Sequence, residues 1–103
     1  MRHDVPLRAL SLGNEPGHAS DYPTMLISDA QLARLARIVG PRLDDLGVEL
    51  WGIDHNWDDV DRLEATGTRG LDAVALHCYA GRPAQAAALA LPWLVTECTG
   101  TDD

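Results

Sequence analysis

Four short apolar runs recur along the chain, and each of them stops at polar residues. They cover residues 7–13, 48–53, 71–76 and 93–96. A short run that is apolar almost throughout and bounded by turn residues is typical of a strand buried on both faces of a parallel sheet. We therefore predict four parallel strands at these positions.

A helix is predicted between the first two strands. Ser28 is a suitable N-cap, Gln31 can complete a capping box with it, and Asp29 lies at the positive end of the helix dipole. One apolar face follows from side chains spaced three and four residues apart, namely Leu32, Leu35, Ala36, Val39, Leu43 and Leu46. The Gly-Pro pair at residues 40–41 is expected to kink or briefly break this helix, and Gly47 to end it.

Two weaker helical segments are predicted between the later strands. Residues 58–64 are short and polar, and residues 66–70 have the composition of a turn. Residues 83–91 are rich in alanine, begin with a proline suited to the first helical position and are followed by Pro92. The resulting order, β-α-β-α-β-α-β, predicts an α/β fold with a parallel sheet and right-handed crossovers.

Length and charge narrow the class of protein. The 103 residues make one domain at most, and 16 acidic against 8 basic residues give a net charge of -8. A chain so acidic, with no stripe of Lys and Arg, is not expected to bind nucleic acid or an anionic membrane. No stretch approaches the roughly 20 apolar residues that span a bilayer. Residues 1–6 lack the apolar segment of a signal peptide, and Asp102-Asp103 is expected to be a solvated tail.

Polar residues follow all four predicted strands at the same end. In a (β/α)8 barrel this edge of the sheet is the active face. An open doubly wound sheet also binds its ligand there, usually with a glycine-rich phosphate turn after the first strand. The turn after residues 7–13 is a poor phosphate cradle, because Glu15 repels phosphate and Pro16 has no amide hydrogen to donate. The barrel is therefore the preferred architecture.

Two of these rim residues are glutamates, Glu15 and Glu97, and each follows an apolar run. Hydrolysis of a glycoside with retention needs two carboxyl groups about 5 Å apart, one protonated and the other ionised. The alternative is a pair of surface glutamates at the starts of loops, and the two residues alone favour this alternative. The surrounding motifs must decide between the two interpretations.

Five motifs, in this order, resemble glycoside hydrolase family 30, the glucosylceramidase-like retaining glycosidases. They are Ser11-Leu12-Gly13-Asn14-Glu15-Pro16, Tyr22-Pro23-Thr24-Met25, Asp54-His55-Asn56-Trp57, His77-Cys78-Tyr79-Ala80-Gly81 and Thr96-Glu97-Cys98. Asn-Glu-Pro alone is shared by several related barrel glycosidase families. The ordered set extends over nearly the entire chain and is more specific.

The resemblance implies a retaining β-glycosidase that acts on a carbohydrate or glycolipid by double displacement. It implies that Glu15 is the general acid/base at the end of barrel strand four and that Glu97 is the nucleophile at the end of strand seven. Asn14 would hydrogen-bond the sugar 2-hydroxyl, and Tyr79 would orient Glu97. The remaining residues implied to line the sugar pocket are His77 and the turn Asp54-His55-Asn56-Trp57.

The aromatic rim residues also have simpler interpretations. Trp51 and Trp93 lie within predicted strands and are expected to pack in the core, whereas Trp57 lies in a rim loop where it could stack on a sugar. His55 and His77 are equally well explained as hydrogen-bonded rim histidines.

The two cysteines are predicted to be free thiols. Cys78 and Cys98 are too few and too far apart in sequence for a disulfide framework or a Cys-x-x-Cys metal site. Their spacing from His77 and Glu97 is too loose for a metal site, so no metal or cofactor is predicted.

The length departs from the family pattern. A complete TIM barrel needs about 250 residues, and this chain supplies only four strands, corresponding to strands four to seven. We therefore expect residues 1–103 to be a partial catalytic barrel, either a fragment or one half of a split barrel. An active glycosidase, an inactive remnant or interaction module, and a pair of copies associated through open sheet edges all remain as alternatives.

Overall fold

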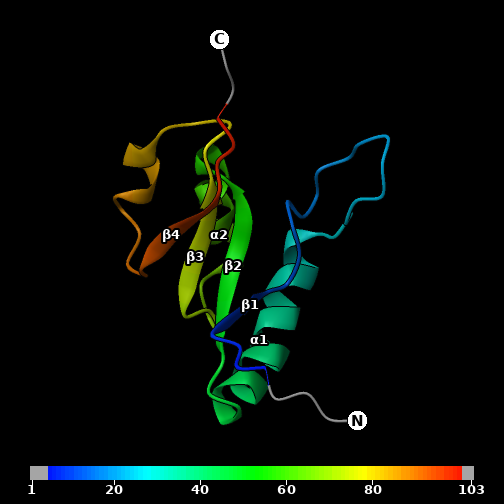
Figure 1. The fold of residues 1–103 in the computed structure, drawn as a ribbon, viewed down its shortest axis with the longest axis vertical. Coiled ribbons are helices and arrows are strands. Elements are labelled where there is room, and N and C mark those ends of the chain that lie inside the picture. Colours follow the sequence, from blue (N-terminus) through cyan, green and yellow to red (C-terminus); the bar gives the residue numbers. More distant parts are fainter. Residues whose placement is uncertain (1–4, 101–103) are drawn as a thin grey trace.

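The fold is a four-stranded parallel sheet with its helices packed beside it (Figure 1). The computed structural model describes residues 5–100, and only the backbone of residues 65 and 66. Residues 1–4 and the predicted Asp102-Asp103 tail lie outside this range. The elements are β1 (Ala9–Ser11), α1 (Asp29–Asp45), β2 (Glu49–Asn56), η1 (Trp57–Asp61), α2 (Arg62–Thr66), β3 (Ala73–His77), η2 (Pro83–Ala86) and β4 (Trp93–Glu97).

The strands lie side by side in the order β1-β2-β3-β4, and every neighbouring pair is parallel. The predicted α/β character and the four parallel strands are confirmed. The sheet is open, so β1 and β4 form its two edges. Two strands differ in length from the prediction, since β1 has only three residues and β2 continues through Asn56.

Helix α1 begins as its sequence predicts. The Ser28 hydroxyl accepts a hydrogen bond from the Gln31 backbone, and the Gln31 side chain accepts one from the Ser28 backbone. The predicted interruption is wrong, because α1 runs without a break through Pro41. Pro41 lies on the exposed side of the helix, where the carbonyl that lacks a partner can bind water. Gly47, with φ of +71°, follows the end of the helix as expected.

The last predicted helix is largely absent. Residues 83–91 form only one short 3-10 turn, η2, instead of a helix of nine residues. A short helix is costly to nucleate and depends on packing. Of this segment only Ala86 is fully buried in the core, while Leu89 and Leu91 are partly buried. Too little apolar surface is therefore available to hold a longer helix.

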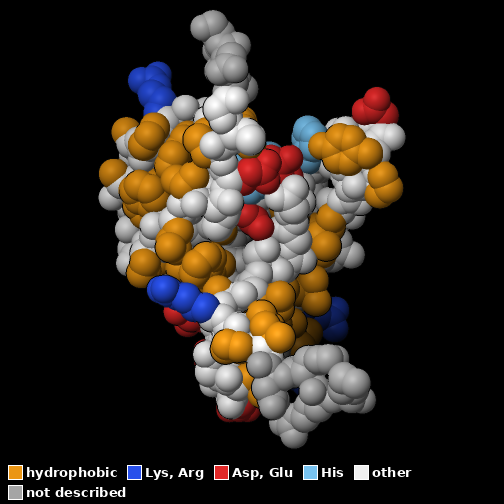
Figure 2. Space-filling view, in the orientation of Figure 1, with side chains coloured by type: hydrophobic (Ala, Val, Ile, Leu, Met, Phe, Trp, Pro, Cys, Tyr) orange, Lys and Arg blue, Asp and Glu red, His pale blue; other side chains and the backbone are white. Residues whose placement is uncertain are grey.

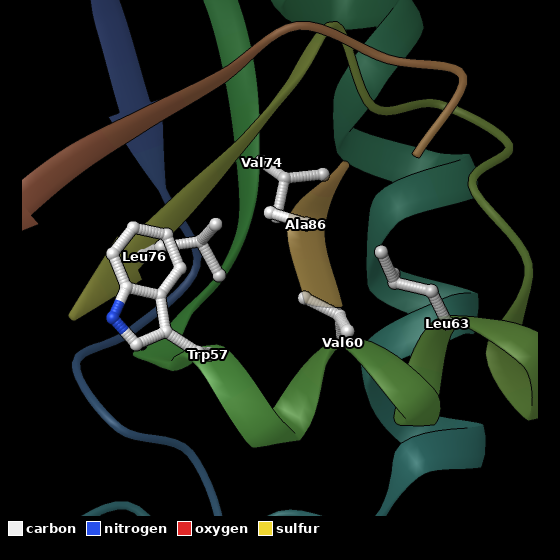
Figure 3. Packing of buried hydrophobic residues seen from close by; sticks show 6 residues of the cluster. All are labelled: Trp57, Val60, Leu63, Val74, Leu76 and Ala86. Atoms are coloured by element: carbon white, nitrogen blue, oxygen red, sulfur yellow. The ribbon is translucent and has the colours of Figure 1, made fainter. Parts of the chain in front are cut away.

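The main core lies between the sheet and the segments η1, α2 and η2. Figure 3 shows its members, which are Trp57, Val60, Leu63, Val74, Leu76 and Ala86. The prediction that Trp57 lies in an exposed rim loop is wrong, since η1 turns its side chain over the sheet and leaves 6% of it exposed. Trp93, predicted to be buried, packs edge-on against Trp57 at 5.5 Å but remains 40% exposed.

The face of β4 is poorly covered. The register pairs Trp93 with Val74 and Val95 with Leu76, so these side chains share the face on which the core is built. Because η2 is short, Trp93 and Val95 remain exposed. Within residues 5–100, no helix combines the length and the apolarity required to cross a membrane.

Candidate active site

The carboxyl ends of the four strands bring together acidic side chains and one histidine. Glu15 follows β1, Asp54 lies near the end of β2, His77 ends β3 and Glu97 ends β4. In Figure 2 acidic side chains gather near the middle of the face, below the C-terminal segment. Residues that are up to 82 positions apart in sequence (15 to 97) therefore share one edge of the sheet.

His77 is the centre of this cluster. Its side chain is fully buried, and its Nδ1 lies 2.9 Å from Glu15 Oε2. Its Nε2 lies 2.9 Å from Asp54 Oδ1 and 3.8 Å from Glu97 Oε2. One imidazole ring thus lies between the two glutamates that the sequence singles out.

The pKa of His77 reflects two opposing influences. Burial lowers the pKa, because the charged imidazolium loses solvation. The hydrogen bonds to Glu15 and Asp54, together with the negative charges of Asp54 and Glu97, outweigh burial and raise the pKa above its ordinary value of 6.5. The site therefore favours the imidazolium form of His77 more than water does.

Asp54 is the site residue that sequence reasoning missed. Its carboxylate accepts hydrogen bonds from Ser11 Oγ at 2.8 Å and from Thr96 Oγ1 at 2.8 Å, in addition to its contact with His77. The available signal was its position, the first polar residue after the apolar run at residues 48–53. The resemblance implies only a turn that lines the sugar pocket at residues 54–57, whereas the Asp54 carboxylate contacts side chains of the other three strands.

Glu15 is held mainly through its backbone and through His77. Its amide donates to the Asp54 carbonyl at 2.9 Å, and its φ of +45° places it in the left-handed region. The following Pro16 is buried, and its carbonyl accepts a hydrogen bond from Arg62 at 2.8 Å. Only 17% of the Glu15 side chain is exposed. The neighbouring Asn14 is exposed beside it.

Glu97 is held from the opposite side by more exposed groups. The Tyr79 hydroxyl donates to Glu97 Oε1 at 3.1 Å, as the family resemblance implies, and it also contacts Thr99. The Tyr79 amide donates to Asn56 Oδ1 at 3.0 Å, which ties this loop to the end of β2. The Glu97 side chain is 47% exposed.

Cys78 and Cys98 form a disulfide, so the prediction of free thiols is wrong. Each cysteine directly follows the end of a strand, and β3 and β4 are neighbours in the sheet. Their Cα atoms are therefore only 5.2 Å apart although 20 positions separate them in sequence. The bond fastens the segment that carries Tyr79 to the segment that carries Glu97.

The other predicted pocket residues, His55, Asn56 and Trp57, lie in three different environments. His55 is partly buried, pairs with Asp59 at 2.8 Å, and its ring lies 6.4 Å from the ring of His77. Asn56 faces the Tyr79 loop. Trp57 is buried in the core and therefore has no free ring face for a sugar.

A cleft opens beside Glu15. It has a volume of about 290 Å³ and lies between the rim and the loop that follows Glu15. Figure 2 shows this loop projecting from the body with a hollow beside the acidic cluster. The lining residues are Asn14, Glu15, His18, Tyr22, Pro23, Thr24 and Met25. The size is near the lower end for pockets that hold small ligands.

Comparison with known proteins identifies a similar solved structure. No protein-family model matches the chain, and no curated protein matches it. The crystal structure of SrfJ from Salmonella typhimurium is similar, with a TM-score of 0.75 and 26% sequence identity. The similarity covers 95% of this chain and 26% of the SrfJ chain. This chain therefore spans about a quarter of the length of the protein that it resembles.

Proposed function

We propose that the chain is part of a (β/α)8 barrel and that β1 to β4 are four consecutive barrel strands. Two observations support this architecture. The spatial order of the strands follows their order in the chain, whereas a doubly wound sheet reverses direction at a switch point. The similarity to SrfJ also extends over nearly all of this chain but only a quarter of a longer one.

We further propose that the chain belongs to a retaining β-glycosidase related to glycoside hydrolase family 30. The observation that carries this proposal is the position of His77, whose ring lies 2.9 Å from Glu15 and 3.8 Å from Glu97. The two carboxylates therefore approach one side chain from opposite edges of the sheet. Enzymatic hydrolysis of a glycosidic bond generally needs two carboxyl groups at one site, which this arrangement supplies.

In this mechanism the two glutamates act in sequence. The carboxylate of Glu97 attacks the anomeric carbon, and Glu15 gives a proton to the glycosidic oxygen as the bond to the leaving group breaks. Glu15 then removes a proton from water, which attacks the glycosyl-enzyme ester and releases Glu97. The cleft beside Glu15 suits the leaving group, because the general acid must reach the departing oxygen.

The substrate class is a β-linked glycoside, as a carbohydrate or a glycolipid. Asn14 is exposed next to Glu15, where it is suited to bind a sugar hydroxyl. Tyr79 is 41% exposed beside Glu97 and offers a polar edge to the same ligand. Asn56 supports this side, because its side chain accepts a hydrogen bond from the Tyr79 amide.

A second candidate is an inactive half-barrel that associates with another copy through its open edges. The observation that favours it is the exposure of Leu10 on β1 and of Trp93 and Val95 on β4. Unpaired strand edges with apolar side chains promote pairing with further strands. Sedimentation equilibrium distinguishes the two, since a dimer at micromolar concentration supports association and a monomer argues against it.

Covalent trapping tests the glycosidase proposal. A cyclophellitol-type epoxide should form an ester with Glu97, because Glu15 protonates the epoxide oxygen as the carboxylate opens the ring. Peptide mass spectrometry should locate the label on Glu97, and Glu97→Gln should abolish it. Glu49→Gln is the matched control, because Glu49 begins β2 at the opposite end of the sheet. A folded chain that is not labelled, or is labelled elsewhere, contradicts the proposal.

A further inference from the structure

Asp54 is the residue at which all four strand ends meet. Its carboxylate contacts Ser11 of β1, His77 of β3 and Thr96 of β4, and Asp54 itself belongs to β2. Its backbone carbonyl accepts the amide of Glu15 at 2.9 Å. Among the described residues, Asp54 therefore contacts both the backbone of Glu15 and the ring of His77, which also lies near Glu97.

The backbone at this point is unusual. Ile53 has φ of +66° and Asp54 has φ of +54°, and the register of β2 against β3 shifts between Ile53 and His55. A β-branched residue rarely occupies the left-handed region, and such strain persists only where the surroundings impose it. The irregularity directs the Asp54 side chain into the rim, where it meets partners from three strands. The strained backbone and the contacts with the other strands therefore both occur at Asp54.

We propose that Asp54 is a positioning residue that holds His77 in one orientation and one tautomer, with Nδ1 turned toward Glu15. This inference rests on the proposed function for the catalytic role of Glu15. Asp54 already accepts hydrogen bonds from Ser11 and Thr96, and an ionised carboxylate only accepts. We therefore assign the proton of its 2.9 Å contact with the ring to His77 Nε2. Nδ1 is then the nitrogen that gains or loses a proton, and it faces Glu15 at 2.9 Å.

The consequence is that Glu15 and His77 share one proton. When Nδ1 carries it, the ring is an imidazolium beside an ionised Glu15. When it moves to Glu15 Oε2, the ring becomes neutral, and Glu15 holds the proton that the leaving group takes up. In the second step the proton that Glu15 removes from water restores the starting state. Each transfer moves one proton and leaves the Nε2 proton in place on the Asp54 side.

Other groups around His77 do not replace Asp54 in this role. Glu97 lies 3.8 Å from Nε2, which is beyond hydrogen-bond distance. The ring centroids of Tyr79 and His55 are 6.2 Å and 6.4 Å from that of His77. Asp54 therefore alone fixes the Nε2 proton among the described neighbours.

Nitrogen-15 NMR of the His77 ring in the folded chain tests the proposal. In the native protein Nε2 should stay protonated across the titration while Nδ1 changes. Asp54→Asn keeps the side-chain shape but replaces one acceptor oxygen with a donor, so the neutral ring should shift toward the Nδ1-protonated tautomer and titrate at lower pH. Asp59→Asn, at the other histidine-carboxylate pair, should leave the His77 ring unchanged.

Two results would overturn the role of Asp54. One is a native His77 that is neutral with its proton on Nδ1, which needs no variant and holds even if Asp54→Asn does not fold. The other is a folded Asp54→Asn protein with an unchanged His77 tautomer and titration.

The rate at which the epoxide labels Glu97 distinguishes a failure of the role of Asp54 from a failure of the proposed function. It should fall about 10- to 100-fold in Asp54→Asn, whereas a native chain that is never labelled refutes the glycosidase and leaves the ring measurement standing.

Discussion

The two proposed catalytic carboxylates are held in different ways on the two sides of the rim. On the β1 side, Glu15 is 17% exposed and depends on His77 and on the backbone of Asp54. On the β4 side, Glu97 is 47% exposed and depends on Tyr79 and on a disulfide next to it. The first side is thus a buried polar network, and the second is an exposed contact reinforced by a covalent bond.

This difference predicts that removing a contact lowers the stability of the fold more on the β1 side than on the β4 side. A buried polar network is costly to break, because removing one partner leaves another group without solvent or a hydrogen bond. An exposed hydrogen bond contributes little by itself, since water replaces the lost partner. The β4 side therefore depends for its stability on the disulfide more than on the hydrogen bonds of Tyr79.

The largest effect should come from His77→Ala. This change removes the partner of both Glu15 and Asp54 and opens a cavity at a fully buried position. We expect a loss of about 4 kcal/mol in the free energy of unfolding, measured by urea denaturation. His18→Ala, at an exposed histidine of the projecting loop, should change it by less than about 0.5 kcal/mol. Equal losses in the two variants would refute the distinction between the buried network and the surface.

Opening the disulfide should have the next largest effect. A bond that closes a loop of this length contributes about 3 kcal/mol, mainly by restricting the unfolded chain. Reductant should lower the free energy of unfolding by this amount, and the double variant Cys78→Ser, Cys98→Ser should be insensitive to reductant. The His77 ring should keep its tautomer in the double variant, because none of its hydrogen bonds involves the cysteines. An altered tautomer would show that the two sides are not independent.

The pH dependence of stability should reflect the titration of His77 in the buried network on the β1 side. Since the pKa of His77 is raised in the folded state, its protonation stabilises the fold fully below pH 6.5 and ceases to do so as pH rises through the folded-state pKa. Stability should therefore fall as the pH rises from 6.5 through the raised pKa of folded His77. The change should be smaller than those above, because a single group titrates. His77→Gln should remove this fall and His18→Gln should retain it; a fall that persists in His77→Gln assigns it to another group.

Tyr79→Phe should have the smallest effect on stability. It removes hydroxyl contacts with Glu97 and Thr99 that are open to solvent, so the loss should stay below about 1 kcal/mol. The variant should nevertheless slow labelling of Glu97 by the epoxide, since the carboxylate loses its orienting donor. Asn56→Ala, which frees the Tyr79 backbone, should slow labelling in the same direction. Unchanged labelling in both variants would show that the β4 side needs no orientation from Tyr79.

The fold was predictable where local chemistry determines it. A strand in the interior of a parallel sheet is apolar almost throughout, and β3 is such a strand. The other three apolar runs also became strands, although the edge strands β1 and β4 remain partly to largely exposed. The start of α1 depends only on Ser28 and Gln31, which are three residues apart. The contact between Tyr79 and Glu97 was available through the family resemblance, since both motifs stand in the family order.

The remaining features depend on which strands become neighbours. The disulfide joins residues whose distance follows from β3 lying beside β4, and sequence spacing alone suggested free thiols. Asp54 acquires its role from three other strands and from a backbone irregularity that no local pattern indicates. Trp57 was assigned to the rim because it follows polar residues, but η1 turns it into the core.

The different roles of Glu15 and Glu97 are tested most directly by the configuration of the glycosyl azide that each alanine variant forms. With an activated aryl β-glucoside and azide, Glu15→Ala should give the β-azide, because azide attacks the ester on Glu97. Glu97→Ala should give the α-azide, because azide takes the place of the missing nucleophile. The same anomer from both variants, or no glycosyl azide from either folded protein, would contradict the account.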